Sequence, residues 1–376
     1  MSNDNLLPRF PAGSDAAPYD AGMPASAMQI STFLGYDGDF RVAARRVAEL
    51  EHAGLDLVWV AEAYGFDSPS LMGFLAAGTE RVQIASGILP IYTRTPSLIA
   101  MTAAGLDALS GGRFQLGLGA SGPQVIEGWH GVPFDAPVGR TREVVEICRA
   151  VWAREAPVVH EGRYYELPLP PEQGTGLAKP LKMITHPVRA RIPVWLAALG
   201  ERNVELAAEI ADGWLPILFI PERAGAVWGA SLRAGHAKRS AGLGPLQISA
   251  GGLLAIGDGD EVLAVRELAR PMVALYVGGM GAKGRNFYND LARRYGFEKE
   301  AEGIQDLYLA GRRDEAMALV PEELLALTSL TGPRAWVAER VAAYREAGVT
   351  DLQVTPVPVG DQTEAGLLEQ LRDIVG

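Results

Sequence analysis

The stretch GRFQLGLGASGPQVIEGWHG, residues 112–131, decides between two folds. Gly117, Gly119 and Gly122 match the G-x-G-x-x-G spacing of a dinucleotide-binding loop, and the strand-like run 113–118 leads into them. In a dinucleotide-binding fold this loop follows the first strand, and an acidic residue ends the second strand about 20 residues later. Here three strand–helix pairs come first, and a long run of helix and loop follows Gly122. The context therefore excludes a dinucleotide-binding fold.

Strand-like and helix-like segments alternate from Met28 onward. The predicted strands are 28–34, 55–62, 81–89, 113–119, 192–199, 212–219, 246–256 and 349–357. The apolar run 55–62 is typical of a strand that is covered on both faces. Eight such strands alternating with helices predict a closed parallel (β/α)8 barrel, the TIM barrel of the α/β class. An open doubly wound sheet would show a similar alternation of strands and helices, but the count of eight strands favours a closed barrel.

Two interruptions of this rhythm divide the chain into regions. Residues 1–27 are rich in Pro, Gly, Ala and Ser and are predicted to form a flexible N-terminal arm, while 28–376 form one barrel domain. Residues 156–191 are predicted to form a hairpin and a proline-rich loop, and 260–347 a helix-rich insertion. Both are expected to roof a site at the C-terminal ends of the strands, with an oligomer contact as the alternative.

Composition and single residue types exclude several functions. The net charge of −11 argues against nucleic acid as a partner. Cys148 is the only cysteine and the five histidines show no metal-binding spacing, so no metal is predicted. No apolar run is long enough to cross a bilayer, and the N-terminus lacks the pattern of a secretory signal, so no membrane association and a cytoplasmic location are expected.

The glycine-rich loop keeps a second interpretation once the dinucleotide-binding fold is excluded. Missing β-carbons would let a flat, wide ligand lie against the backbone, and Pro123 stands at a favourable first position of a helix. Such a loop suits a flavin-like ring system. A tight barrel turn that binds nothing is the alternative.

Four motifs in order resemble the bacterial luciferase-like superfamily. They are GLGASGPQVIEGWHG (117–131), SGILPIYTRTPSL (86–98), EGRYYELP (161–168) and AALGERNVELAAEIADGWLP (197–216). The resemblance covers roughly residues 28–356 and looks closest to the branch of coenzyme F420-dependent oxidoreductases. It implies a (β/α)8 barrel, usually a homodimer, that holds F420 or FMN at the C-terminal strand ends.

The resemblance also implies particular cofactor-binding residues. Gly87 and Ile88 match the bulge with a cis peptide beneath the cofactor ring, where glycine eases the geometry. The segment passing along the ring is Ala120, Ser121, Gly122, Pro123 and Gln124. The start of the next helix, which would hold the cofactor phosphate through its amides and dipole, is Ala198, Leu199, Gly200 and Arg202.

A basic cluster lies near this phosphate motif in the sequence. It consists of Lys179, Lys182, Arg189, Arg191 and Arg202. In so acidic a chain the cluster indicates a seat for the phosphate and oligoglutamate tail of F420, and a solvated loop is the alternative.

Glu62 and His130 are the candidate catalytic residues. Glu62 is expected at the barrel rim, where partial burial would raise its pKa and suit it to supply a proton, although a structural role is nearly as well supported. His130 and Tyr64 are weaker candidates, and Arg94 is expected to meet a cofactor edge, a substrate anion or a carboxylate. In the sugar-phosphate dehydrogenases of the superfamily a histidine stands where this chain has Ala63, and a glutamate near Gly122, so these departures favour a reductase.

Three functions remain open at this point. The leading hypothesis is an F420-dependent oxidoreductase that transfers hydride between the cofactor and a small or medium organic substrate. The alternatives are an FMNH2-dependent monooxygenase and a non-catalytic barrel that serves as a binding or assembly subunit. The segments that would select the substrate, 156–191 and 271–297, carry no diagnostic motif.

Overall fold

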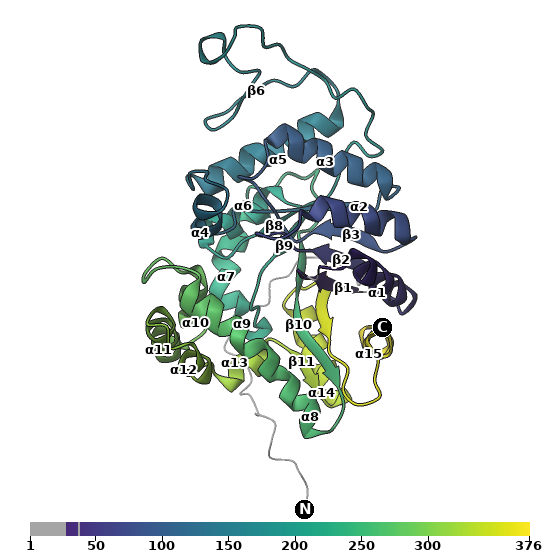
Figure 1. Ribbon diagram of the computed structural model, residues 1–376, viewed down its shortest axis with the longest axis vertical. Coiled ribbons are helices and arrows are strands. Elements are labelled where there is room, and N and C mark those ends of the chain that lie inside the picture. The colour runs from purple at the N-terminus through teal and green to yellow at the C-terminus, as the bar shows by residue number, and fades with distance from the viewer. Residues whose placement is uncertain (1–27, 37) are drawn as a thin grey trace, which may run out of the picture.

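The computed structural model describes residues 28–36 and 38–376, and within them eight parallel strands close into a barrel (Figure 1). The barrel strands are β1 (Gln29–Leu34), β2 (Leu57–Val60), β3 (Gln83–Ser86), β5 (Phe114–Gly119), β8 (Val194–Ala197), β9 (Gly213–Leu215), β10 (Gln247–Ile256) and β12 (Asp351–Pro356). Each pairs with the next in parallel, and the pairing of β12 with β1 completes the ring. The predicted closed (β/α)8 barrel is confirmed. The predicted arm, 1–27, lies outside the described residues.

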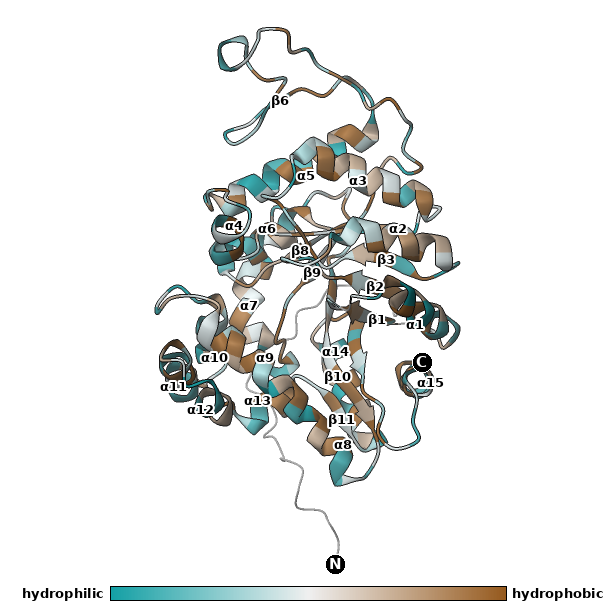
Figure 2. Ribbon diagram, in the orientation of Figure 1, coloured by the Kyte–Doolittle hydropathy of each residue, from teal (hydrophilic) through white to brown (hydrophobic). Residues whose placement is uncertain are grey.

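Helices surround the strands and connect them. The outer helices are α1 (Phe40–His52), α2 (Ser68–Gly78), α3 (Pro96–Leu109), α5 (Pro137–Ala153), α6 (Glu201–Ile210), α7 (Pro221–His236), α14 (Arg334–Glu346) and α15 (Glu364–Val375), with the short α4 (Pro123–Gly128) after β5. Figure 2 shows hydrophobic residues along the central strands and hydrophilic residues on outer helices such as α5 and α11. This separation is what a barrel core requires, because both faces of each strand are covered.

The insertion between β10 and β12 follows a strand, as predicted. Its elements are α8 (Asp260–Ala264), a 3-10 turn (Val265–Ala269), α9 (Arg270–Ala274), the π-helical turn η3 (Leu275–Gly279), α10 (Phe287–Arg294), α11 (Glu298–Leu309), α12 (Arg313–Ala318), α13 (Glu322–Leu327) and β11 (Leu330–Gly332). Strand β11 pairs in parallel with the C-terminal half of β10. The insertion therefore starts and ends at the C-terminal side of the barrel.

The segment 156–191 contains the predicted hairpin but lies elsewhere. Strands β6 (His160–Glu161) and β7 (Glu166–Leu167) pair antiparallel, and the 3-10 turn η1 (Pro171–Gln173) follows. The segment follows helix α5, not a strand, and Glu143 of α5 accepts the amide hydrogens of residues 163–165. In Figure 1 it extends beyond α5 and α3. The expectation that it roofs the site is wrong, because the hairpin and the loop extend outward beyond α5 and α3 and do not lie over the strand ends.

A buried acid lies in the barrel interior. Asp351 of β12 is fully buried, and its Oδ2 accepts hydrogen bonds from the hydroxyls of Ser31 (2.7 Å) and Ser249. The Nε1 of Trp59 donates to Ser31 Oγ at 3.2 Å, while Asp351 Oδ1 has no partner among the described residues. Burial raises the pKa of Asp351 to about 6, against the opposing effect of these hydrogen bonds.

Candidate functional site

Glu62 lies at the barrel rim, two residues after β2, as predicted from the sequence. Its carboxylate forms a bidentate ion pair with Arg94, with distances of 2.5 Å from Nη1 to Oε1 and 3.0 Å from Nη2 to Oε2. The amide and the hydroxyl of Ser68 also donate to Oε2, at 2.9 and 3.0 Å. Of the partners considered for Arg94, the carboxylate is the one observed. Four hydrogen bonds therefore fix the orientation of this carboxylate.

The break predicted in the third barrel strand is present. Strand β3 ends at Ser86, the Gly87–Ile88 peptide is cis, and the short strand β4 (Leu89–Pro90) resumes the pairing with β5. A β-carbon on Gly87 would overlap the ring of Phe33, and one on Gly119 would lie 3.0 Å from the side chain of Ile88. These glycines therefore make room for neighbouring protein groups. Packing within the protein therefore explains Gly87 and Gly119 without a ligand.

The loop after β5 leads from the barrel into α4. Ala120 and Ser121 precede Gly122, which caps α4 without a side-chain hydrogen bond, and Pro123 and Gln124 begin the helix. Ser121 adopts φ of +60°, a left-handed conformation that is uncommon for a residue with a side chain. The loop lies at the C-terminal end of β5.

His130 follows α4 and is partly buried. Its Nε2 is shielded from solvent and has no hydrogen-bond partner among the described residues. The neighbouring Trp129 is largely exposed, and its ring centroid lies 6.3 Å from that of Tyr64 in the loop after β2. Trp129 is therefore not part of the hydrophobic core. This contact brings the loop after β2 and the loop after α4 together at the mouth.

Helix α6 begins at a glycine cap, in the segment where the family resemblance places the cofactor phosphate. Gly200 caps the helix without a side-chain hydrogen bond, which leaves the first amides of α6 unpaired by a cap. The carbonyls of Ala198 and Leu199 accept hydrogen bonds from Trp214 (2.9 Å) and Trp228 (3.0 Å), and these bonds fix the approach to the helix. Arg202 is exposed in the first turn.

The basic cluster is divided between the two ends of the barrel. Arg189 pairs with the buried Asp107 and donates to the carbonyl of Phe114, the first residue of β5, while Arg191 pairs with Asp212 before β9. The Nζ of Lys182 donates to the carbonyl of Glu155, just beyond the end of α5. These contacts place the segment at the N-terminal end of the barrel, away from α6. The interpretation of the whole cluster as a binding site for the cofactor tail is wrong. Lys182, Arg189 and Arg191 lie at the opposite end of the barrel from Arg202, although they are close to it in sequence.

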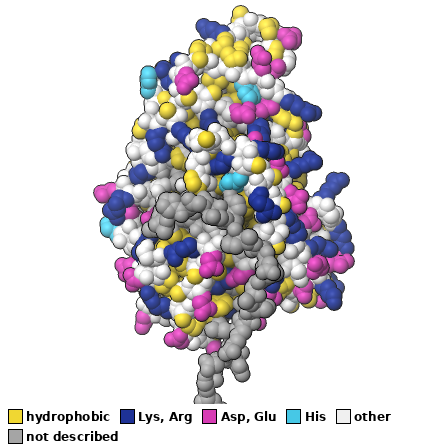
Figure 3. Space-filling view, turned by 180° about the vertical axis from the view of Figure 1, so that it is seen from behind, with side chains coloured by type: hydrophobic (Ala, Val, Ile, Leu, Met, Phe, Trp, Pro, Cys, Tyr) yellow, Lys and Arg dark blue, Asp and Glu magenta, His cyan; other side chains and the backbone are white. Residues whose placement is uncertain are grey.

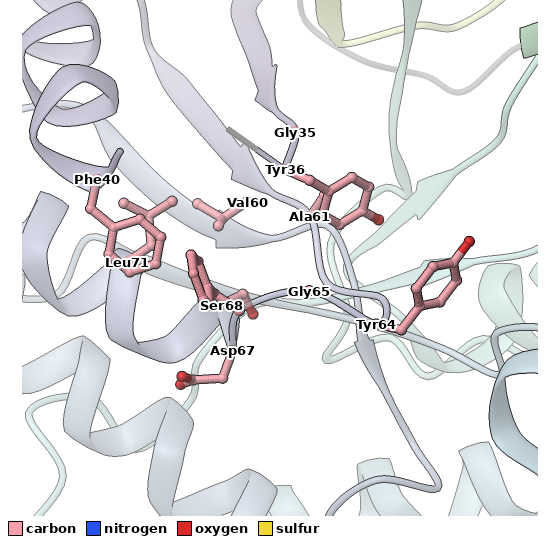
Figure 4. Close-up of a pocket in the computed structure, with 11 residues that line it drawn as sticks. Gly35, Tyr36, Phe40, Val60, Ala61, Tyr64, Gly65, Asp67, Ser68 and Leu71 are labelled. Atoms are coloured by element: carbon pink, nitrogen blue, oxygen red, sulfur yellow. The ribbon is translucent and has the colours of Figure 1, made fainter. Parts of the chain in front are cut away.

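The insertion after β10 contributes aromatic residues that the sequence did not single out. Phe287 lies against the cap of α6, since a β-carbon on Gly200 would be 3.2 Å from its ring. Tyr276 of η3 lies near enough to Tyr36 to contribute to the raised pKa of that phenol, whose main cause is burial. A cavity of about 350 Å³ opens beside Tyr36, between the loops after β1 and β2 (Figure 4). Isolated aromatic residues in loops gave no periodic signal that could have identified this cavity.

The described residues offer neither a metal site nor a membrane-spanning helix. Within 28–36 and 38–376 no cluster of three or more His, Cys, Asp or Glu side chains is arranged to hold a metal ion. In the same part of the chain no helix is both long enough and apolar enough to span a membrane.

Comparison with known proteins identifies the family. Residues 22–351 match the model of the luciferase-like monooxygenase family. A Mycobacterium tuberculosis protein named as a coenzyme F420-dependent oxidoreductase is 42% identical over 353 residues, covering 93% of this chain and 98% of its own.

Two solved structures show the same fold at low identity. The coenzyme F420-dependent tetrahydromethanopterin reductase of Methanopyrus kandleri superposes with a TM-score of 0.72 at 23% identity, over 92% of this chain and 98% of its own. The oxygenating constituent of the Pseudomonas putida 3,6-diketocamphane monooxygenase, in complex with FMN, gives 0.64 at 19% identity over 93% and 98%. With the family match spanning most of the sequence and the barrel closed as these barrels are, the chain belongs to the luciferase-like monooxygenase family.

Proposed function

We propose that this protein is a coenzyme F420-dependent oxidoreductase that transfers hydride between F420 and a small or medium organic molecule. The observation that carries the proposal is the 42% identity, across nearly the whole of both chains, to a relative named for F420 dependence. F420 when bound supplies the hydride, and the protein supplies binding and orientation.

The residues at the C-terminal end of the barrel fit such a cofactor. The uncapped amides of α6, with Gly200 and Arg202, would hold its phosphate, because helix N-termini favour anions. Gly87, Ile88 and the segment from Ala120 to Gln124 are proposed to line its ring. Their place at the ends of β3 and β5 supports this assignment.

The two candidate catalytic residues are supported differently. Glu62 is held by Arg94 and Ser68, so we assign it to positioning the rim loops and not to donating a proton. His130 stays a proposed site residue because its buried Nε2 has no partner among the described residues. An ordered partner supplied by a bound molecule would satisfy that nitrogen.

Titration with F420 and with FMN, followed by the fluorescence of each, tests the cofactor. Tight F420 binding without an FMN response is expected. Replacing Arg202 with Ala should weaken F420 binding about tenfold, the effect of losing roughly 1.4 kcal/mol of charge-assisted contact at an exposed site. Arg45→Ala, an exposed arginine on the outer helix α1, should leave the affinity unchanged. Preference for FMN, or equal affinity of wild type and Arg202→Ala, would contradict the assignment.

We also propose that the protein is a homodimer that pairs through helices α2 and α3. Large apolar side chains are exposed on these helices, namely Phe74, Leu98, Met101 and Leu109. Further apolar side chains are exposed in 156–191, namely Leu177, Leu181, Ile184 and Val188. Figure 3 shows hydrophobic side chains gathered at that end of the molecule. An apolar surface spread over neighbouring elements is typical of an interface.

Size-exclusion chromatography with light scattering tests the dimer. Met101→Glu should shift the protein toward the mass of one chain, since it would bury a charge at the interface. Val42→Glu, on an exposed apolar residue of α1, is the matched control and should remain dimeric. A wild-type mass of one chain would contradict the proposal.

A further inference from the structure

A cavity at the barrel mouth is separate from the residues proposed to hold the cofactor. It lies over the ends of β1 and β2, and its walls come from the loops that join these strands to α1 and α2. The proposed cofactor residues follow β3, β5 and β8 instead. Tyr64 links the two regions, because its ring approaches that of Trp129 beyond α4. The cavity therefore opens beside the proposed cofactor site.

One side of the cavity is apolar. Phe40, Val60 and Leu71 line it, and Figure 4 shows these three side chains grouped away from the two tyrosines. Phe66 extends this wall and contacts Phe40 edge-on, with ring centroids 5.8 Å apart. The volume of about 350 Å³ falls within the range of small-molecule sites, about 300–1,000 Å³.

The other side presents two phenols. In Figure 4 the hydroxyls of Tyr36 and Tyr64 both point away from the Phe40 side. The residues Tyr36, Tyr64 and Phe66 are between 63% and 69% exposed, which is unusual for residues of this size. Within the described part of the chain, neither hydroxyl makes a hydrogen bond. Although much of the Tyr36 side chain is exposed, its partial burial and the nearby Tyr276, Tyr64 and Glu62 raise its pKa, so the hydroxyl keeps its proton and can donate it to a hydrogen bond.

The remaining polar groups of the cavity are already engaged. Ser68 donates its hydroxyl to Glu62, and the carboxylate of Asp67 accepts from the amide and hydroxyl of Ser70 at the start of α2. Among the described residues that line the cavity there is no lysine or arginine. Arg94, which lies just outside it, is neutralised by Glu62. An anionic ligand would find no cation among the described residues that line this cavity.

We propose that this cavity is the substrate site and that its substrate is an uncharged, largely apolar carbonyl compound. This inference rests on the proposed function, since a carbonyl carbon accepts hydride. The apolar body lies against Phe40, Val60 and Leu71, and the carbonyl oxygen accepts hydrogen bonds from the hydroxyls of Tyr36 and Tyr64.

Saturation-transfer NMR on the purified full chain, without added cofactor, tests the site with three probes of similar size. Acetophenone carries the carbonyl, ethylbenzene lacks it, and benzoate adds a charge. Acetophenone and ethylbenzene should bind, and benzoate at least tenfold more weakly. Benzoate binding as tightly as acetophenone would overturn the proposal.

Two variants and one control locate the bound probe. Replacing Tyr36 and Tyr64 together with Phe keeps both rings and should weaken acetophenone binding about five- to tenfold, with ethylbenzene unchanged, because each lost neutral hydrogen bond accounts for about two- to tenfold. Phe66→Ala, at an exposed side chain, should weaken both apolar probes. Tyr164→Phe, in the hairpin outside the cavity, should change neither. Unchanged acetophenone binding in the double variant or in Phe66→Ala would overturn the proposal.

An F420 titration of the same samples separates this inference from the proposed function. If acetophenone binds in a manner that depends on Phe66 but F420 does not bind, the assignment of F420 as cofactor is refuted and the cavity remains a ligand site. F420 binding with no probe bound in the cavity would refute the cavity alone.

Discussion

The buried Asp351 should make the protein lose stability as the pH rises, opposite to the usual behaviour of a carboxylate. Ordinary carboxylates have a lowered pKa in the folded state and stabilise it above that pKa. Asp351 has its pKa raised from 3.8 to about 6, chiefly because it is fully buried in the barrel. Replacing it with Asn keeps the shape and an oxygen that can accept from Ser31 and Ser249, and removes the ionisation.

The size of the stability loss follows from the pKa of Asp351 in the unfolded and in the folded protein. Below pH 3.8 the acid is protonated in both states and contributes no pH dependence. Between pH 3.8 and about 6 the unfolded chain releases the proton while the folded chain keeps it, so the free energy of unfolding falls by about 1.4 kcal/mol for each pH unit. Above about pH 6 the total reduction in the free energy of unfolding stays constant at ~3 kcal/mol.

The assay is urea unfolding followed by circular dichroism at intervals from pH 4 to pH 8, in dilute solution because the chain has a pI near 5.1. The free energy of unfolding of wild type minus that of Asp351→Asn should fall by ~3 kcal/mol across this range and should level off above about pH 6. The difference isolates Asp351, since Asp56 and the other carboxylates are common to both proteins.

A matched control is Asp290→Asn, an exposed acid on α10, whose curve should run parallel to that of wild type. A wild-type curve that stays parallel to that of Asp351→Asn from pH 4 to pH 8 would refute the reasoning. It would show that the serine and tryptophan donors offset the cost of burying the charge.

Three further substitutions test other parts of the structure. Glu62→Gln leaves Arg94 without its ion-pair partner and should cost about 3 kcal/mol of unfolding free energy in urea; if turnover at saturating substrate then falls by more than a hundredfold in the folded variant, the positioning role is wrong and a chemical role returns. Arg189→Met removes the partner of buried Asp107 and should cost about 3–5 kcal/mol, while the F420 affinity of the folded protein stays unchanged; weaker F420 binding would restore a cofactor-tail role for 179–191. Gly117→Ala places a β-carbon inside the Ser86 carbonyl oxygen, so soluble expression should fail or the thermal midpoint should drop by more than 10 °C, whereas Gly105→Ala, which meets open space in α3, should melt like wild type.

The sequence determined the barrel because its signal is local and repeated. Each predicted strand contains an observed one, since a strand buried on both faces is read from its own residues. The rim position of Glu62 and the break at Gly87–Ile88 followed from the same strand ends and from the family resemblance.

What surrounds those strand ends was decided by tertiary structure. Lys182, Arg189 and Arg191 stand close to Arg202 in sequence, yet the barrel separates them because a connection before β8 lies at the opposite end from the helix after it. Arg94 becomes the partner of Glu62, and Tyr36 meets Tyr64, only when loops from different strands converge. Such pairings depend on the closure of the ring, which no stretch of the chain encodes by itself.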